Sequence, residues 1–154
     1  MNATNNKAVK EGGAIYIEGY YKDTFTTIDD YYLENNKAIN GSAISIHGDS
    51  VNVTNSIVLN NTAVNGAVYV WGDYVILENS TYANNTAIDG AGLYIYGDYT
   101  EFNNVTVVHN IASNNGGGIF LNGDHVLINS VIGHLHYLHC FFHNFFRQTF
   151  VVHT

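Results

Sequence analysis

"NNTAVNGAVYVWGDYVILENSTYA", residues 60–83, places two asparagines, a glycine and a Gly-Asp pair between short runs of alternating apolar residues. The same order begins again at Asn84-Asn85, directly after the stretch ends. Self-similarity at a fixed period is typical of a repeat architecture, in which each unit stacks on its neighbours. The stretch is therefore one structural unit, and its asparagines and glycines belong at tight turns.

Asparagine pairs mark the period along most of the chain. They start at residues 5, 35, 60 and 84, and His109-Asn110 takes the matching place, so the successive spacings are 30, 25, 24 and 25 residues. A short alternating strand follows each pair, and four of the five strands run directly into Gly-Asp. A period near 24 with short strands and no helical segment predicts an all-β, right-handed, single-stranded parallel β-helix. We expect a solenoid of about five coils of 24–25 residues over residues 1–132.

The alternation assigns side chains to two faces, because successive residues of a strand point to opposite sides. The pairs expected inside the first strands are Ile15/Ile17, Ile44/Ile46, Val68/Val70, Leu93/Ile95 and Ile119/Leu121. Polar residues also recur after the second strand of each coil, and we expect them to form an inward structural ladder. In such a ladder each side-chain amide bonds to backbone groups at a bend and to the amide one coil away. Its members would be Asp30, Asn55, Asn79 and Asn104.

Composition and charge exclude several classes of protein. Five Lys+Arg against thirteen Asp+Glu give a net charge of −8, so the chain lacks the basic surface that nucleic acid requires. The single cysteine excludes an internal disulfide, and no apolar run is long enough to insert into a membrane as a helix. No secretion signal is visible at the start, so we expect any signal or anchor to lie outside this sequence.

The repeats resemble those of adhesin-like surface proteins of archaea and bacteria, a style related to the polymorphic outer-membrane-protein repeat with its GGAI element. The resemblance rests on "GGAIYI" (12–17), "NNTA" followed by glycine, and "NS" followed by an Asn pair, and it covers residues 5 to about 130. The FxxN half of the bacterial motif is replaced by "NSIVLNN" (55–61) and "NSTYANN" (79–85). The resemblance implies an extracellular stalk or adhesin at a cell surface. It names no ligand.

Outward aromatic residues are the candidate contact surface. Tyr16, Tyr69, Tyr94 and Phe120 share one predicted column, and Trp71 and Tyr96 share the next. Aligned rings on a flat β face suit stacking on sugar rings or on an apolar partner surface. The alternative is that the rings stack on each other and stabilise the sheet, as cross-strand aromatic pairs do.

Catalysis and cofactors have little support in the repeat. Asp49, Asp73, Asp98 and Asp124 follow the repeat glycines, where turn chemistry accounts for them better than calcium binding does. The repeat region contains no arginine to act as a lyase base, and the acids that recur with the period do not form the unique carboxylate pair of a hydrolase. We therefore expect no enzyme activity and no cofactor. A carbohydrate-active β-helical enzyme, or its binding module, is the alternative.

The last segment, residues 133–154, departs from the repeat. It contains five of the eight histidines and the only cysteine, and it contains no acidic residue. Three interpretations stay open: an out-of-frame or truncated end, a capping helix with Leu135, Leu138, Phe142 and Phe146 on its apolar face, and a metal site. The metal ligands would be His139, Cys140 and His143.

Together, these patterns predict a fragment of a surface protein that presents a rigid, non-catalytic contact face. The expected partners are carbohydrate or cell-surface components, and the neighbouring β-helix repeats of a longer protein. Nucleic acid is not an expected partner.

Overall fold

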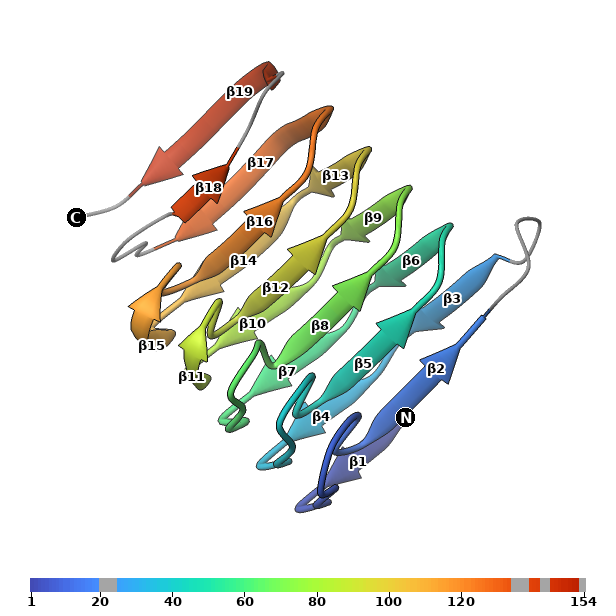
Figure 1. Ribbon diagram of the computed structural model, residues 1–154. Helices are drawn as coiled ribbons and strands as arrows, with labels where there is room; N and C mark the ends of the chain where they lie inside the picture. Colours follow the sequence, from blue (N-terminus) through green and yellow to red (C-terminus); the bar gives the residue numbers. More distant parts are fainter. Residues whose placement is uncertain (20–24, 134–138, 142–144, 153–154) are drawn as a thin grey trace.

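The computed structural model describes residues 1–19, 25–133, 139–141 and 145–152, with side chains described up to Asn129. All strand pairs in this part of the chain are parallel, and it contains no helix, hence none that could cross a membrane. The chain winds into a solenoid whose equivalent strands lie side by side (Figure 1). Four turns lead from Ile15 in the first unit to Ile119 in the last complete one. The predicted parallel β-solenoid is confirmed.

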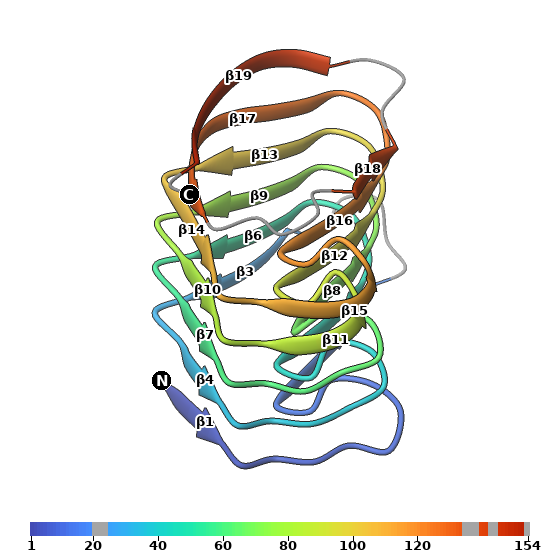
Figure 2. The same ribbon diagram turned by 90° about the vertical axis from the view of Figure 1, so that its left-hand side faces the viewer.

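Each turn contributes strands to different faces of the solenoid, as the two views show (Figures 1 and 2). The first face consists of β2 (Ile15–Glu18), β5 (Ile44–His47), β8 (Val68–Trp71), β12 (Leu93–Tyr96), β16 (Ile119–Asn122) and β18 (His139–Phe141). The second consists of β3 (Thr26–Asp29), β6 (Val51–Thr54), β9 (Val75–Glu78) and β13 (Thr100–Asn103). The third begins with β1 (Asn2–Thr4), β4 (Tyr32–Glu34), β7 (Ile57–Leu59), β10 (Thr81–Ala83) and β14 (Val105–Val108). The long strand β17 (Val126–Gly133) pairs with both β13 and β14, and β19 (Phe145–Val152) pairs with β17. A two-stranded sheet of β11 (Thr86–Asp89) and β15 (Ile111–Asn115) completes the fold.

The corners between faces use left-handed backbone, which asparagine and aspartate tolerate better than most residues do. The first member of each asparagine pair has positive φ, for example 55° at Asn60 and at Asn84. The corner between the second and third faces is also left-handed, with φ of 49° at Asn55 and 48° at Asn79. The asparagine signals in the sequence therefore do mark corners.

The core lies between the three faces. The apolar pairs predicted to point inward are buried from β5 to β16, and only Ile15 and Ile17 in the first turn are partly exposed. The third face adds a column that includes one aromatic residue, and its members are Leu33, Val58, Tyr82 and Val107. Tyr82 is fully buried, and this burial raises the pKa of its phenol.

The predicted position of the inward polar ladder is wrong. Asp30, Asn55, Asn79 and Asn104 are exposed at the left-handed corner, although Asn104 Nδ2 does donate to Asn79 Oδ1 one turn away at 2.9 Å, as a ladder requires. The buried column consists instead of the second member of each asparagine pair. Its residues, called the asparagine column below, are Asn36, Asn61, Asn85 and Asn110.

The asparagine column repeats one pattern of hydrogen bonds at every turn. The Oδ1 atom of Asn61 accepts bonds from the backbone N–H of Asn36 at 2.8 Å and from its Nδ2 at 3.1 Å. The Nδ2 of Asn61 donates to the Leu33 carbonyl at 3.1 Å and to Asn85 Oδ1 at 3.1 Å. Since a buried amide without partners is costly, this pattern satisfies both the side chain and the corner backbone beside it.

The backbone of the last segment is extended where it is described. Strand β18 pairs in parallel with β16, and β19 pairs in parallel with β17. One interpretation placed Phe146 on a capping helix. Phe146 instead belongs to strand β19, so that interpretation is wrong at this position. Leu135, Leu138 and Phe142 lie outside the described residues.

Asn61→Ala is expected to lower the free energy of unfolding by about 2–4 kcal/mol, because it leaves a backbone N–H, a side-chain amide and a carbonyl buried without partners. Urea unfolding followed by circular dichroism measures the change. Asn60→Gly is the matched control at the adjacent residue, where glycine accepts the positive φ, and its cost should stay under about 1 kcal/mol. Equal losses in the two variants would contradict the role of the asparagine column.

Candidate functional site

The outer side of the first face presents two columns of side chains in register. One column consists of Tyr16, Ser45, Tyr69, Tyr94 and Phe120, and the next consists of Glu18, His47, Trp71, Tyr96 and Asn122. The six aromatic residues predicted from the sequence are therefore brought together on one surface. We call the rings of these two columns, with the imidazole of His47, the aromatic face.

The first column is largely a structural stack. Tyr69 and Tyr94 lie with ring centroids 5.3 Å apart and planes 19° apart, and Tyr94 and Phe120 lie 4.5 Å and 14° apart. Tyr69 is only 7% exposed, which departs from the prediction of an open surface ring. Alternation gives the direction of a side chain, but it does not show that neighbouring rings will cover it.

Burial also affects the phenols of this column. It raises the pKa of Tyr69 to about 12, with added contributions from Tyr94 and from the charge of Glu11. Burial likewise raises the pKa of Tyr94, aided by Asp89 and Tyr96. The raised pKa of each phenol reflects how far the rings of this column are removed from water.

The second column is the open one. Trp71 is 56% exposed and Tyr96 is 46% exposed, the largest exposures among the rings of β8, β12 and β16; in the first column, Tyr16 of β2 is 47% exposed. Their centroids are 5.5 Å apart and their planes are tilted by 47°. Rings at this angle do not cover each other's faces, so part of each ring stays available to a flat partner.

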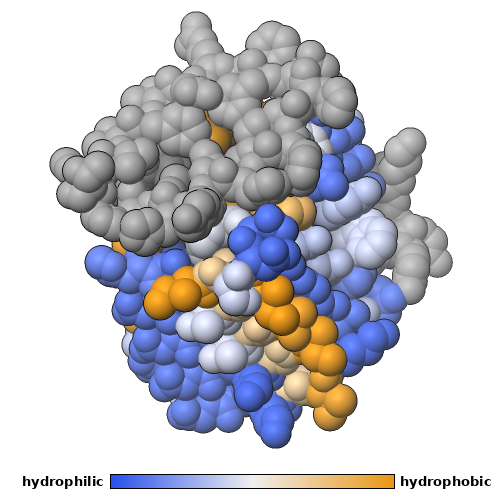
Figure 3. Space-filling model, turned by 60° about the vertical axis from the view of Figure 1, so that its left-hand side comes forward, coloured by the Kyte–Doolittle hydropathy of each residue, from blue (hydrophilic) through white to orange (hydrophobic). Residues whose placement is uncertain are grey.

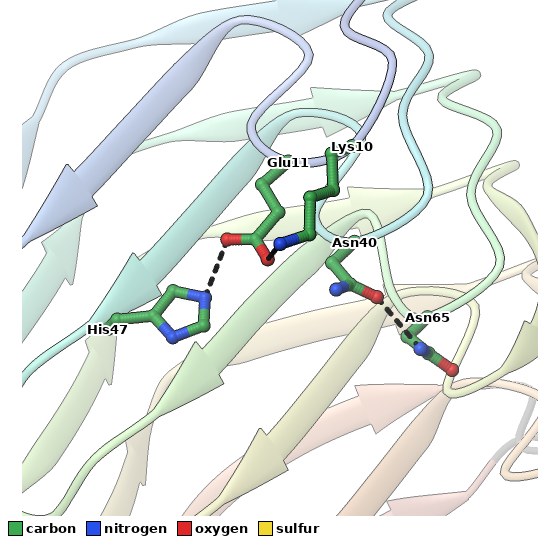
Figure 4. A network of polar contacts seen from close by, with 5 residues as sticks. All are labelled: Lys10, Glu11, Asn40, His47 and Asn65. Atoms are coloured by element: carbon green, nitrogen blue, oxygen red, sulfur yellow. Dashed lines mark hydrogen bonds and ion pairs between the residues drawn. The ribbon is translucent and has the colours of Figure 1, made fainter.

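His47 also belongs to the aromatic face, although the sequence analysis did not identify it as a contact residue. Its imidazole lies 5.9 Å from the Tyr16 ring, 5.6 Å from Tyr69 and 6.2 Å from Trp71, and it links the rings on either side of Ser45. Its Nε2 is 2.8 Å from Glu11 Oε2 (Figure 4). The signal was present, because "SAISIHG" and "GAVYVWG" align His47 with Trp71.

A groove of about 410 Å³ runs beside the open rings. It is lined by Asp49, Trp71, Gly72, Asp73, Tyr96, Gly97, Asp98, Asn122 and Gly123. The carboxylates form a column in which Asp49 Oδ1 accepts the backbone N–H of Asp73 at 2.9 Å, and Asp73 Oδ1 accepts that of Asp98 at 2.8 Å. The sequence predicted a turn role for these aspartates, and the bonds differ from a local turn cap in that each carboxylate binds the backbone of the next turn of the solenoid.

Glycine allows the backbone of successive turns to approach closely beside the groove. A Cβ added to Gly72 would lie 2.1 Å from the Gly48 carbonyl oxygen, and one added to Gly97 would lie 2.0 Å from the Gly72 carbonyl oxygen. Backbone from successive turns is therefore in direct contact here, and no side chain fills the space. The groove combines two exposed ring faces with carboxylate and amide acceptors, a set that suits a ligand with both flat apolar faces and hydroxyl groups.

Tyr74, Tyr99 and His125 form a second ring column, which the sequence reasoning also missed. Tyr74 and Tyr99 stack at 4.8 Å and 6°, and Tyr99 and His125 stack at 4.5 Å and 13°. The three residues directly follow Gly-Asp at successive turns, and this position is the signal that predicts the column. Tyr99 is stacked on both sides, by Tyr74 and His125, whereas Tyr74 stacks only on Tyr99 among the described rings.

Metal binding has no support in the side chains that the structure describes, among which no group of three or more histidine, cysteine or acidic residues could hold an ion. The side chains of His139 and Cys140, and the whole of His143, lie outside the described part. The predicted metal site stays a hypothesis.

Comparison with known proteins gives one match. Residues 4–18 match the family model of the Chlamydia polymorphic membrane protein repeat, and these residues include the GGAI element and strand β2. No curated protein and no solved structure matches the chain. The matched repeat and the parallel β-solenoid together fit a fragment built from repeats of the polymorphic-membrane-protein type.

Proposed function

We propose that this chain is a surface-displayed, non-catalytic segment of a β-solenoid adhesin that contacts glycans through Trp71 and Tyr96. The repeat matched by residues 4–18 is named for membrane proteins, which supports a place at the cell surface. The observation that carries the glycan proposal is the open ring pair, exposed by 56% and 46% beside a polar groove.

Register favours a long ligand over a small one. Trp71 and Tyr96 are paired positions on adjacent strands, which lie roughly 4.8 Å apart along the axis. Asp49, Asp73 and Asp98 repeat at the same spacing along the groove. A chain of sugar rings running along the axis meets a ring face and a hydrogen-bond acceptor at each turn, so its contacts add along the solenoid.

The arrangement of the acids favours contact over catalysis. A hydrolase needs two carboxyl groups in different environments, one held protonated and one ionised. Asp49, Asp73 and Asp98 instead repeat a single environment, since each accepts the backbone N–H of the residue one turn later. A carbohydrate-active enzyme is the alternative, and it would need a site beyond this groove.

The two columns should differ in their effect on stability. Tyr69→Ser is expected to lower the free energy of unfolding by about 2–3 kcal/mol, because a nearly buried ring loses its contacts with Tyr94 and its surroundings. Tyr96→Ser, the control on the adjacent strand, should cost about 1 kcal/mol or less, since its ring is largely exposed. Urea unfolding of both variants measures the difference, and a larger loss for Tyr96→Ser would reverse the assignment of the columns.

The Trp71→Ser/Tyr96→Ser double variant is expected to lose binding to polysaccharides by tenfold or more while it stays folded, because exposed rings supply stacking area but little core packing. An array of microbial and host polysaccharides, probed below the melting temperature, provides the measurement. The matched control is Tyr74→Asn/Tyr99→Asn, which removes an equally exposed pair and should leave binding unchanged. Asparagine suits the positive φ at both control positions. If the parent binds no polysaccharide, or if the double variant binds as well as the parent, the glycan proposal is wrong.

A further inference from the structure

The second ring column is interrupted at one turn. Phe25, Ser50, Tyr74 and Tyr99 directly precede β3, β6, β9 and β13, and these four strands pair in register from their first residues (Figure 1). Ser50 therefore stands at a level where the turns on either side carry a ring. The backbones of Phe25 and Tyr74 lie two strand spacings apart, roughly 9.6 Å, so the level of Ser50 has room for one flat ring between them.

This interruption belongs to a pocket of about 270 Å³. Its lining combines the interrupted column with the outward residues that follow two positions later in β6, β9 and β13, and it includes Phe25, Ser50, Asn52, Tyr74, Ile76 and Glu101. Phe25 is 82% exposed and Tyr74 is 55% exposed, so both rings offer contact area to a ligand. The volume lies just below the range typical of drug-sized ligands, and it suits a single ring with a short substituent.

Tyr74 has one ring face that no described ring covers. Its other face stacks on Tyr99 at 4.8 Å and 6°, and Tyr99 stacks in turn on His125 at 4.5 Å and 13°. A ligand ring at the level of Ser50 would continue this column at nearly the same spacing. Offset or parallel stacking of this kind adds to the free energy gained from apolar contact alone.

The far end of the pocket is acidic. Glu101 is the one charged residue that lines it within the described part of the chain. Glu101 Oε1 accepts hydrogen bonds from Asn103 Nδ2 at 3.0 Å and from Asn129 Nδ2 at 3.3 Å, and these bonds orient the carboxylate. A carboxylate beside an aromatic slot attracts an ammonium group and repels an anion.

The spacing between the slot and the acid sets the length of the ligand. Asn52, Ile76 and Glu101 are paired positions on successive turns. The levels of Asn52 and Glu101 are therefore roughly 9.6 Å apart, a distance that a two-carbon amine arm and the glutamate side chain span together.

We propose that this pocket binds small aromatic amines, in which a flat ring carries an ammonium group on a short alkyl chain. The ring lies between Phe25 and Tyr74, the alkyl chain crosses Ile76, and the ammonium group meets Glu101. Ser50 and Asn52 lie at the edge of the ring, where their side chains can bond a ring hydroxyl or ring N–H. The pocket shares no lining residue with the groove beside Trp71 and Tyr96, so this binding does not depend on glycan contact.

The combination of groups distinguishes this pocket from a merely apolar surface. Figure 3 shows a band of apolar side chains between hydrophilic surfaces on one side of the molecule. Such a band does not by itself select a ligand. The pocket instead joins an open ring face, a hydroxyl, an amide and a carboxylate, and each of these groups favours a different part of an aromatic amine.

Titration with tyramine tests the proposal on the full chain. Amide NMR spectra of the isotope-labelled protein should show saturable binding with a Kd on the order of 0.1–1 mM, and the largest shifts should fall at Ser50, Asn52 and Tyr74. p-Ethylphenol has the same ring without the amine, and it should bind about fivefold more weakly or worse. 3-(4-Hydroxyphenyl)propionate has an acid in place of the amine, and it should bind about tenfold more weakly or worse.

Ser50→Tyr separates the slot from the fold. Ser50 has φ of 58°, and Tyr74 and Tyr99 adopt 60° and 59° at equivalent positions, so tyrosine fits this backbone. Its ring should fill the slot and weaken tyramine binding about tenfold or more, while the melting temperature stays the same or rises. Ser50→Gly is the matched control, since glycine accepts the positive φ and leaves the slot open, and its affinity should stay within about twofold of the parent.

Glu101→Gln tests the charge. It should weaken tyramine binding about fivefold or more and leave p-ethylphenol binding unchanged, and added salt should weaken the binding of tyramine alone. Trp71→Ser/Tyr96→Ser should bind tyramine as the parent does, because both rings lie outside the pocket.

Several results would overturn the proposal. They are a parent that does not bind tyramine below about 10 mM, tenfold above the expected range, an acid or a phenol that binds as tightly as tyramine, and a Ser50→Tyr variant that binds as well as Ser50→Gly. Loss of tyramine binding in Trp71→Ser/Tyr96→Ser, with binding kept in Ser50→Tyr, would place the amine in the other groove. Shifts at Ser50 and Tyr74 with methyl glucoside but not with tyramine would identify a sugar ring as the occupant instead.

Discussion

In-register parallel stacking is the constraint on which the rest of this structure depends. Each residue stands one strand spacing, roughly 4.8 Å, above its equivalent in the previous turn, so the sequence must supply compatible side chains in columns. Apolar columns fill the interior, and left-handed residues form the corners. The asparagine column is the most demanding of these, because each buried amide needs the amides of both neighbouring turns. A change at one turn therefore affects the hydrogen bonds of the next.

The same constraint produces the exposed surfaces. Columns on the outer side of a solenoid stack in register, so any residue type that recurs with the period becomes a continuous stripe. The rings of the aromatic face and the carboxylates beside them are two such stripes. The rings and the carboxylates line the same groove, so the two stripes form one surface along the solenoid.

The sequence predicted the period, the corners and the apolar columns correctly, because these depend only on spacing and alternation. It did not show which of two asparagine columns faces inward. Asn55 and Asn61 recur equally well, and only the left-handed backbone at Asn55 turns its side chain outward.

The solvent exposure of a side chain was harder to predict from the sequence than the face to which it points. Tyr69 and Trp71 both point away from the core, yet only Trp71 is open, because Tyr69 lies between the rings of His47 and Tyr94. His47 and the Tyr74–Tyr99 stack were overlooked although their positions follow from the repeat.

Distances between pairs of spin labels placed along one exposed column test the stacking most directly. Lys7, Lys37, Thr62, Thr86 and Ile111 occupy successive paired positions. In a Cys140→Ser background, cysteine pairs at 37/86, 37/111 and 7/111 carry nitroxides two, three and four turns apart, and unlabelled protein in excess suppresses intermolecular signals. In-register stacking predicts backbone separations of roughly 10, 14 and 19 Å, so the measured distances should rise by about one strand spacing per turn. Distances that fail to increase in this order, or a 7/111 distance no longer than the 37/86 distance, would contradict the parallel stacked arrangement.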